Sequence, residues 1–151
     1  MKKKVYILSI IFLLIDIFTK QLVKNTLNLY DSIPIIPNFF SITYVINDGA
    51  AFSILKGELW LFIILGFVLL FFIFYYLQKE KLNIYKTIYY SLLIAGVLGN
   101  LLDRMLYRGV IDFLDFTIFS YNAPIFNLAD TFIVISVILI VFESLKEVLK
   151  K

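Results

Sequence analysis

Residues 59–77 read LWLFIILGFVLLFFIFYYL, an unbroken run of apolar and aromatic side chains without a single charge. A helix needs about 20 mostly apolar residues to cross a hydrocarbon core roughly 30 Å thick. The whole chain has the same character, because 62% of its 151 residues are hydrophobic, whereas soluble domains are about 45–50% apolar. The sequence therefore predicts an integral membrane protein, and its length fits a single domain over residues 1–151.

Three more segments have the length and hydropathy of membrane spans. The expected spans cover about residues 5–23, 59–77, 84–102 and 127–142. In the first long connection, residues 24–58, the stretch Ser41-Ile-Thr-Tyr-Val-Ile46 favours a strand and Asn47-Asp-Gly49 favours a turn. The second long connection covers residues 103–126. We expect an all-α integral membrane protein with four transmembrane helices, a small extracytoplasmic β-sheet and a short outer-surface helix or loop.

The distribution of charge predicts how the chain sits in the membrane. If the N-terminus is cytoplasmic, nine of the 14 basic residues fall on the cytoplasmic side: Lys2, Lys3, Lys4, Lys79, Lys81, Lys86, Lys146, Lys150 and Lys151. Eight of the 11 acidic residues then fall outside or in the outer halves of the spans: Asp16, Asp31, Asp48, Glu58, Asp103, Asp112, Asp115 and Asp130. Because cytoplasmic flanks carry an excess of Lys and Arg, both termini are expected in the cytoplasm and both long connections outside.

The residue types that the chain lacks exclude several kinds of chemistry. It has no cysteine and no histidine. A disulfide framework, a zinc site of the usual His/Cys kind, a Ser–His–Asp triad and a cysteine protease are therefore excluded. We expect no metal, no cofactor and no nucleic-acid partner. Acid–base chemistry in this chain has to be carried by aspartate or glutamate.

Two aspartates stand where a lipid-embedded chain does not accept charge without a reason. Asp112 lies in Gly109-Val-Ile-Asp-Phe-Leu-Asp115, and Asp130 lies at the start of the fourth expected span. Ionisable groups at membrane depth are costly and mark functional sites. Each also has a plain interpretation: Asp112 as a solvated loop acid, and Asp130 with Asn127 as caps of a helix N-terminus. A pair of carboxylates favours the functional interpretation.

Other polar residues follow helical spacing near the outer ends of the spans. Asp16 and Lys20 are four apart, which predicts a structural ion pair with the Lys20 ammonium reaching the outer interface. Asn100, Asp103 and Arg104 share one face of the third span. That face predicts either interfacial anchoring with a local Asp103–Arg104 pair, or support for a site in which Arg104 donates to a carbonyl or phosphate.

Taken together, these stretches resemble the lipoprotein signal peptidase family, also called signal peptidase II. The resemblance rests on five stretches in register: Asp16-Ile-Phe-Thr-Lys20, Asn47-Asp-Gly-Ala-Ala-Phe52, Gly99-Asn-Leu-Leu-Asp-Arg104, Val110-Ile-Asp-Phe113 and Phe126-Asn-Leu-Ala-Asp130. They extend over nearly the whole chain. One difference is Ile17, where the family usually has glutamine.

The resemblance implies a membrane aspartic endopeptidase that removes signal peptides from prolipoproteins. It would cut on the N-terminal side of a cysteine that already carries diacylglycerol, with Asp112 and Asp130 as its catalytic dyad. The remaining motif residues would bind substrate or support the site: Asn47, Gly49, Asn100, Arg104, Asn127, Asp16 and Lys20. The implied partners are the diacylglyceryl-prolipoprotein, membrane lipid and an inhibitor of the globomycin type. The resemblance further implies a multi-pass protein of the bacterial cell membrane with its active site near the outer face, and nothing requires more than a monomer.

Two other classes of function are compatible with a small polytopic chain. A subunit of an ion or proton-coupled transporter would use intramembrane carboxylates along a transmembrane path. Here the polar residues collect on one side, and residues 59–77 carry none of the charges such a path needs. A non-catalytic membrane scaffold would tolerate replacement of Asp112 and Asp130 by asparagine.

Overall fold

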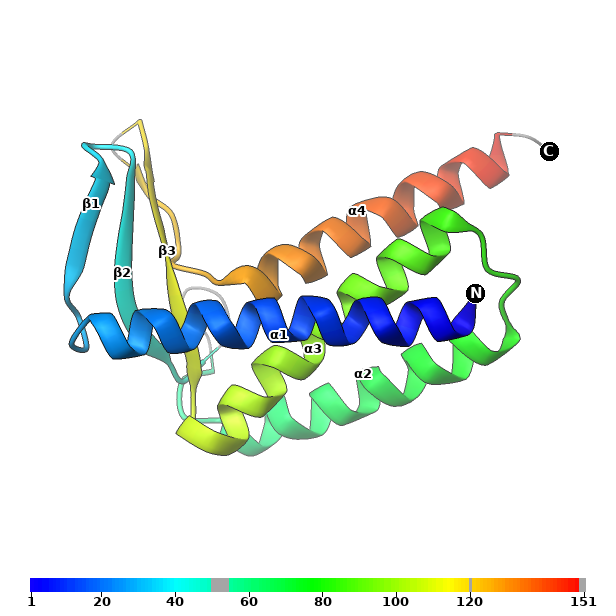
Figure 1. The fold of residues 1–151 in the computed structure, drawn as a ribbon, viewed down its shortest axis with the longest axis horizontal. Coiled ribbons are helices and arrows are strands. Elements are labelled where there is room, and N and C mark those ends of the chain that lie inside the picture. The colour runs from blue at the N-terminus through cyan, green and yellow to red at the C-terminus, as the bar shows by residue number, and fades with distance from the viewer. Residues whose placement is uncertain (50–54, 120, 150–151) are drawn as a thin grey trace.

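The computed structural model describes residues 1–49, 55–119 and 121–149, in which four long helices carry a small sheet at one end (Figure 1). The helices are α1 (Lys2–Thr26), α2 (Leu59–Lys79), α3 (Ile84–Tyr107) and α4 (Leu128–Val148). The strands are β1 (Ser32–Ile36), β2 (Phe40–Asn47), β3 (Val110–Ile118) and β4 (Tyr121–Asn122), paired in the order β1-β2-β3-β4. The N-terminus and the C-terminal end of α4 lie at the end remote from the sheet (Figure 1).

Three of the described helices are long and apolar enough to cross a membrane: Lys2–Thr26, Leu59–Lys79 and Leu128–Lys146. The third expected span, residues 84–102, lies in α3, which does not reach that hydropathy because Lys86, Asn100 and several tyrosines interrupt its apolar residues. Instead, α3 is the buried helix of the bundle, with every residue from Tyr89 to Val97 buried. Its apolar side chains pack against those of the other three helices.

Small residues let α3 approach its neighbours closely, as is common between membrane helices. A Cβ on Gly96 would lie 2.5 Å from the carbonyl oxygen of Ala129 in α4. A Cβ on Gly99 would collide with the side chain of Asp16 in α1. The absence of side chains at Gly96 and Gly99 therefore sets the distance between the helices that carry the polar residues.

The expected strand over residues 41–46 is confirmed, because these residues lie within β2. The second long connection, where we expected Asp112 to lie in a loop, is largely a strand. Its described part continues α3 to Tyr107 and then forms β3 and β4. Val110 to Ile118 are mostly β-branched and aromatic, and they supply β2 with an antiparallel partner, which an exposed strand edge requires. Asp112, expected in a loop, consequently lies on a strand.

Packing beneath the sheet fixes which way Asp112 points. Ile111 and Phe113 belong to a buried cluster with Val23 of α1 and Tyr44 of β2. Successive side chains of a strand point to opposite faces. Asp112 therefore projects from the other face, toward α3 and α4.

We predict that Gly96→Ala destabilises the helix bundle, whereas Gly66→Ala does not. The new methyl group at residue 96 meets backbone of α4, and such overpacking costs about 1–3 kcal/mol. At Gly66 the added Cβ would lie 3.1 Å from the Cδ1 of Leu101, the mobile end of a side chain that can move aside. Reversible unfolding in detergent micelles measures both free energies. Equal stability of the two variants would contradict the close α3–α4 approach.

Candidate active site

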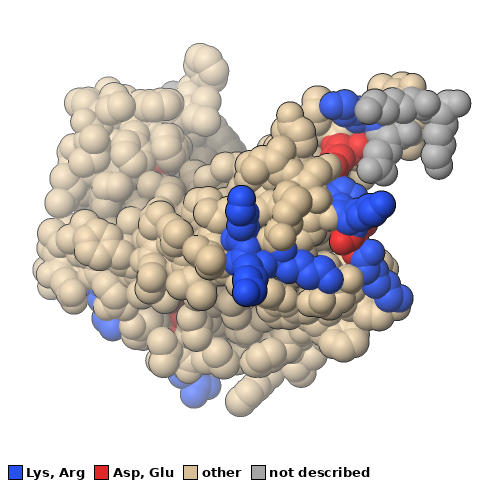
Figure 2. Space-filling model, turned by 45° about the vertical axis from the view of Figure 1, so that its right-hand side comes forward, with Lys and Arg blue, Asp and Glu red and all other residues tan. Residues whose placement is uncertain are grey.

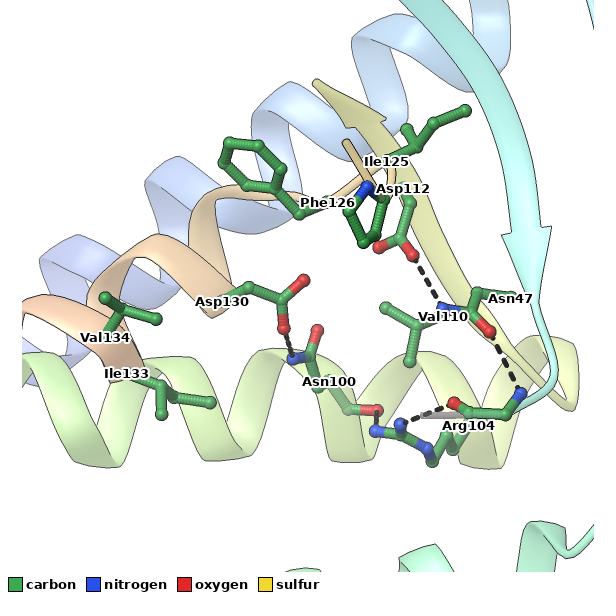
Figure 3. Close-up of a pocket in the computed structure, with 12 residues that line it drawn as sticks. Asn47, Asn100, Arg104, Val110, Asp112, Ile125, Phe126, Asp130, Ile133 and Val134 are labelled. Carbon is green, nitrogen blue, oxygen red and sulfur yellow. Dashed lines mark hydrogen bonds between the residues drawn. The ribbon is translucent and has the colours of Figure 1, made fainter. Parts of the chain in front are cut away.

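A cavity of about 280 Å³ opens between the sheet and the ends of α3 and α4 that lie next to it. Six of the residues named from the sequence line it: Asn47, Gly49, Asn100, Arg104, Asp112 and Asp130. Figure 3 shows the carboxylates of Asp112 and Asp130 projecting into this space from β3 and from the first turn of α4. The apolar side chains of Ile133 and Val134 extend the wall along α4. Segments far apart in sequence thus place two carboxylates on one cavity.

Asp112 is held by two asparagine amides. Its Oδ1 accepts a hydrogen bond of 2.7 Å from the Nδ2 of Asn127, and its Oδ2 accepts one of 3.1 Å from the Nδ2 of Asn47. Asn47 is itself fixed, because its Oδ1 accepts the backbone N–H of Gly49 at 3.0 Å. Only 2% of Asp112 is exposed, so its carboxyl group has almost no access to bulk water.

Asp130 combines a capping role with a place on the cavity. Its backbone N–H donates to the Oδ1 of Asn127 at 2.9 Å, while its Oδ2 accepts the backbone N–H of Asn127 at 3.3 Å. This is a capping box at the start of α4. Its Oδ1 also accepts a bond of 2.7 Å from the Nδ2 of Asn100. The plain interpretation of Asn127 and Asp130 as helix caps is therefore correct, and it coexists with their place at the cavity.

Asn100 and Asn127 connect the two carboxylates through their amides. The Nδ2 of Asn127 lies 3.2 Å from the Oδ1 of Asn100, and Asn100 in turn donates to Asp130. The amide oxygen of Asn100 also accepts from the Nζ of Lys20 at 3.2 Å. Each amide thus turns its nitrogen toward a carboxylate because its oxygen is occupied elsewhere, by the Lys20 ammonium or by the α4 cap.

Lys20, whose ammonium binds Asn100, is only 1% exposed. Its Nζ lies 2.8 Å from the Oδ2 of Asp16 and 2.9 Å from the Oδ2 of Asp103. The predicted Asp16–Lys20 pair is confirmed, but the prediction that Lys20 reaches the interface is wrong, because two buried carboxylates hold its ammonium inside. The prediction of a local Asp103–Arg104 pair is also wrong, because the carboxylate of Asp103 pairs with the ammonium of Lys20. We call Lys20, Asp16 and Asp103 the Lys20 cluster.

The two acids of the Lys20 cluster also hold backbone next to the carboxylate pair. Asp16 accepts the N–H of Ala129 at 2.9 Å, one residue before Asp130. Asp103 accepts the N–H of Ile111 at 3.1 Å, one residue before Asp112. This role of Asp103 is not evident from the sequence, because an acid on the same helix face as Asn100 fits a local pair with Arg104 equally well.

Arg104 closes the cavity on the side of α2. Its guanidinium lies 4.9 Å from the ring centre of Phe62, and its NH2 donates to the carbonyl oxygen of Gly49 at 3.4 Å. Its NH1 donates to the carbonyl oxygen of Asn100 at 3.3 Å. Arg104 therefore joins α2, α3 and the segment after β2. The rest of the motif that begins at Asn47, residues 50–52, lies outside the described residues.

The environment of Asp112 changes its acidity. Burial, and after it the negative charge of Asp130, raises the pKa of its carboxyl group from 3.8 to about 7. Hydrogen bonds from Asn47 and Asn127 act in the opposite direction, since they stabilise the carboxylate. A raised pKa means that the folded chain holds this proton more tightly than the unfolded chain. Ionisation of Asp112 therefore lowers the stability of the fold as the pH rises from about 4 to about 7.

The structure defines a polytopic membrane protein with a polar site at one end of its helices. Among the described residues, no group of three or more His, Cys, Asp or Glu side chains is placed to hold a metal ion. Instead, the amides of Asn47, Asn100 and Asn127 orient two carboxylates at one end of an apolar helix bundle, and the buried Lys20 ammonium holds Asn100. Such a site is equipped for proton transfer at one fixed place.

Comparison with known proteins identifies the family. The family model described as Signal peptidase (SPase) II matches residues 8–146. A lipoprotein signal peptidase of Staphylococcus haemolyticus is 42% identical over 97% of this chain and 97% of its own length. One of Staphylococcus aureus is 38% identical over 100% of this chain and 96% of its own. The chain belongs to the signal peptidase II family and is thus a peptidase, not the transporter subunit or scaffold considered above.

The solved structures agree with this assignment. One described as a bacterial membrane enzyme superposes with a TM-score of 0.91 at 38% sequence identity. The match covers 97% of this chain and 90% of that one. The chain is therefore a bacterial membrane protein with a fold that has been observed by experiment.

We predict that Asp112 titrates near pH 7 and that its two kinds of neighbour move its pKa in opposite directions. Asp130→Asn removes the nearby negative charge and lowers the pKa of Asp112, whereas Asn47→Ala removes a hydrogen bond to the carboxylate and raises it. Carbon NMR of aspartate labelled at the carboxyl carbon measures each titration. An Asp112 midpoint near 4 in the wild type, or no downward change in Asp130→Asn, would contradict this electrostatic account.

Proposed function

We propose that this chain is an aspartic endopeptidase that removes signal peptides from prolipoproteins, with Asp112 and Asp130 as its catalytic dyad. The cut would fall on the N-terminal side of the diacylglyceryl-modified cysteine. The observation that carries the proposal is that Asn127 and Asn100 bring carboxylates from β3 and α4 onto one cavity. Family membership and the name of the similar proteins, lipoprotein signal peptidase, support the reaction and the substrate class.

The two carboxyl groups differ in a way that suits their two tasks. Asp112, with its pKa raised to about 7, is the member that holds the proton. Asp130 accepts N–H bonds from Asn100 and from the backbone of Asn127 in the first turn of α4, where the helix dipole favours a negative charge, and it is the member that acts as the base. Two neighbouring carboxylates resist double ionisation, so the pair shares one proton.

Hydrolysis then needs only water and this pair. Asp130 takes a proton from the water as its oxygen attacks the scissile carbonyl carbon, and the carboxyl group of Asp112 donates a hydrogen bond to the carbonyl oxygen. The tetrahedral intermediate collapses as the C–N bond breaks, and the amine leaves with the proton that Asp130 accepted. The new carboxylate carries the oxygen from water. No covalent intermediate and no cofactor takes part.

The remaining site residues have supporting roles in this proposal. Arg104, Asn47 and the backbone at Gly49 line the cavity, where they offer N–H donors to the substrate backbone. Asn127 and Asn100 orient the dyad. Lys20, paired with Asp16 in α1, binds Asn100 and so holds α1 against α3. An inhibitor of the globomycin type would occupy the same cavity. Because one chain supplies both carboxylates, a monomer suffices.

The distribution of charge and apolar surface supports an orientation for the protein. Lys and Arg gather at the end that carries the N-terminus, while the flanks of the bundle are almost free of charge (Figure 2). We infer that this end is cytoplasmic and that the sheet lies on the outer surface. We also infer that α3 crosses the bilayer, shielded from lipid by the other three helices. The dyad would then lie near the outer headgroups. Val134, 57% exposed on α4 beside the cavity, would face lipid there.

This location suits a lipid-anchored substrate. The apolar signal peptide and the acyl chains of the modified cysteine can remain in the bilayer beside α4. The scissile bond then has to reach only the level of the first turn of α4, where Asp130 lies. The membrane lipid is therefore part of how the substrate is held.

We predict that Asp112→Asn and Asp130→Asn each lower cleavage by roughly a thousandfold or more, since each removes one half of the proton transfer. The measurement uses a diacylglyceryl-modified prolipoprotein peptide and detergent-solubilised protein. Asp115→Asn is the matched control on the same strand: Asp115 accepts from the Oγ1 of Thr43 at 2.7 Å, and an amide oxygen can still do so. Comparable activity of all three folded variants would refute the dyad, and an inactive wild type would refute the proposed function.

A further inference from the structure

A second cavity of about 310 Å³ adjoins the one described above. The two share Asn47, Asp112, Pro124 and Ile125 in their walls. They differ in the other residues that line them. The first is bounded by residues of α3 and α4, whereas the described residues that line the second come from β2, β3 and the connecting segments and from no helix. We call the second one the rim cavity.

The rim cavity has an apolar floor and a charged edge. Val45, Pro124 and Ile125 supply the floor, and Asp48 and Lys56 stand at the edge. The Nζ of Lys56 and the Oδ1 of Asp48 are 4.0 Å apart, with 71% and 41% of the side chains exposed. An ion pair so open to water is weak. Both charges therefore remain available to a polar ligand.

The backbone around the rim cavity is held in place on both sides. Tyr30, which lines the cavity, has φ of +72°, a left-handed conformation that is uncommon for a bulky residue. Its N–H donates to the carbonyl oxygen of Tyr44 in β2 at 2.8 Å, and the N–H of Tyr44 donates back to Asp31 at 3.0 Å. On the opposite side, the N–H of Gly57 donates to the carbonyl oxygen of Asp48 at 3.3 Å. Strain kept by surrounding bonds is a feature of ligand-contacting positions.

We propose that the rim cavity binds the first residues of the mature lipoprotein, those that follow the modified cysteine, and sets the preference for them. This inference rests on the proposed function. A peptide bond that reaches Asp112 has a cavity on either side of it, because Asp112 lies in the wall common to both. The signal peptide is apolar and belongs beside α4, where Ile133 and Val134 lie. The mature segment leaves into water, and the rim cavity is its path.

Charge reversal at the edge provides the test. Two diacylglyceryl-modified substrates are compared that differ only in an acidic or a basic residue shortly after the cysteine. Lys56→Glu should raise the ratio of kcat/KM for the basic over the acidic substrate by roughly three- to tenfold, and Asp48→Lys should lower it by a similar factor. Lys24→Glu, an outer-side reversal outside the rim cavity, serves as control and should leave the ratio unchanged.

The outcomes separate this inference from the function on which it rests. A wild type that cleaves neither substrate overturns the proposed function and the inference with it. Cleavage by all proteins with one common ratio overturns the inference alone. A variant that loses activity equally on both substrates shows a structural role and also overturns it. Opposite changes in the two variants, with an unchanged ratio in Lys24→Glu, would establish the rim cavity as the binding site of the mature segment.

Discussion

The arrangement of the whole site depends on one buried cation. Lys20 is almost completely shielded from water, and an ammonium in such a place is tolerated only with partners that offset its lost hydration. Its partners Asp16 and Asp103 come from α1 and α3. Each of these acids also accepts the backbone N–H of the residue just before Asp130 or Asp112. The Lys20 cluster thereby fixes α1, α3, β3 and the start of α4 against one another.

The same constraint explains why the two carboxylates are not equivalent. The Lys20 ammonium occupies the amide oxygen of Asn100, so the amide nitrogen faces Asp130. The α4 cap occupies the amide oxygen of Asn127, so that nitrogen faces Asp112. Asp112 is the more deeply buried of the two, with a raised pKa. Burial and hydrogen bonding therefore give two chemically identical side chains different surroundings, as acid–base catalysis by a carboxylate pair requires.

Much of this architecture is predictable from the sequence, and the failures have a common cause. Local patterns were sufficient for three of the four expected spans, for β2 and for the asparagine and aspartate at the start of α4. The motifs of the resemblance named six of the residues that line the cavity. The burial of Lys20, the true partner of Asp103 and the strand that carries Asp112 were missed. Each depends on a neighbour from another element, and helical spacing or strand propensity says nothing about which element that is.

The central claim is that a water molecule, activated by the dyad, attacks the substrate directly. A single turnover with enzyme in excess, run in heavy-oxygen water, tests it. We expect one heavy oxygen in the new C-terminal carboxylate of the released signal peptide and none in Asp112 or Asp130 after digestion of the protein. A signal peptide without heavy oxygen, together with label in either aspartate, would show that a carboxylate had attacked the substrate and would contradict the account.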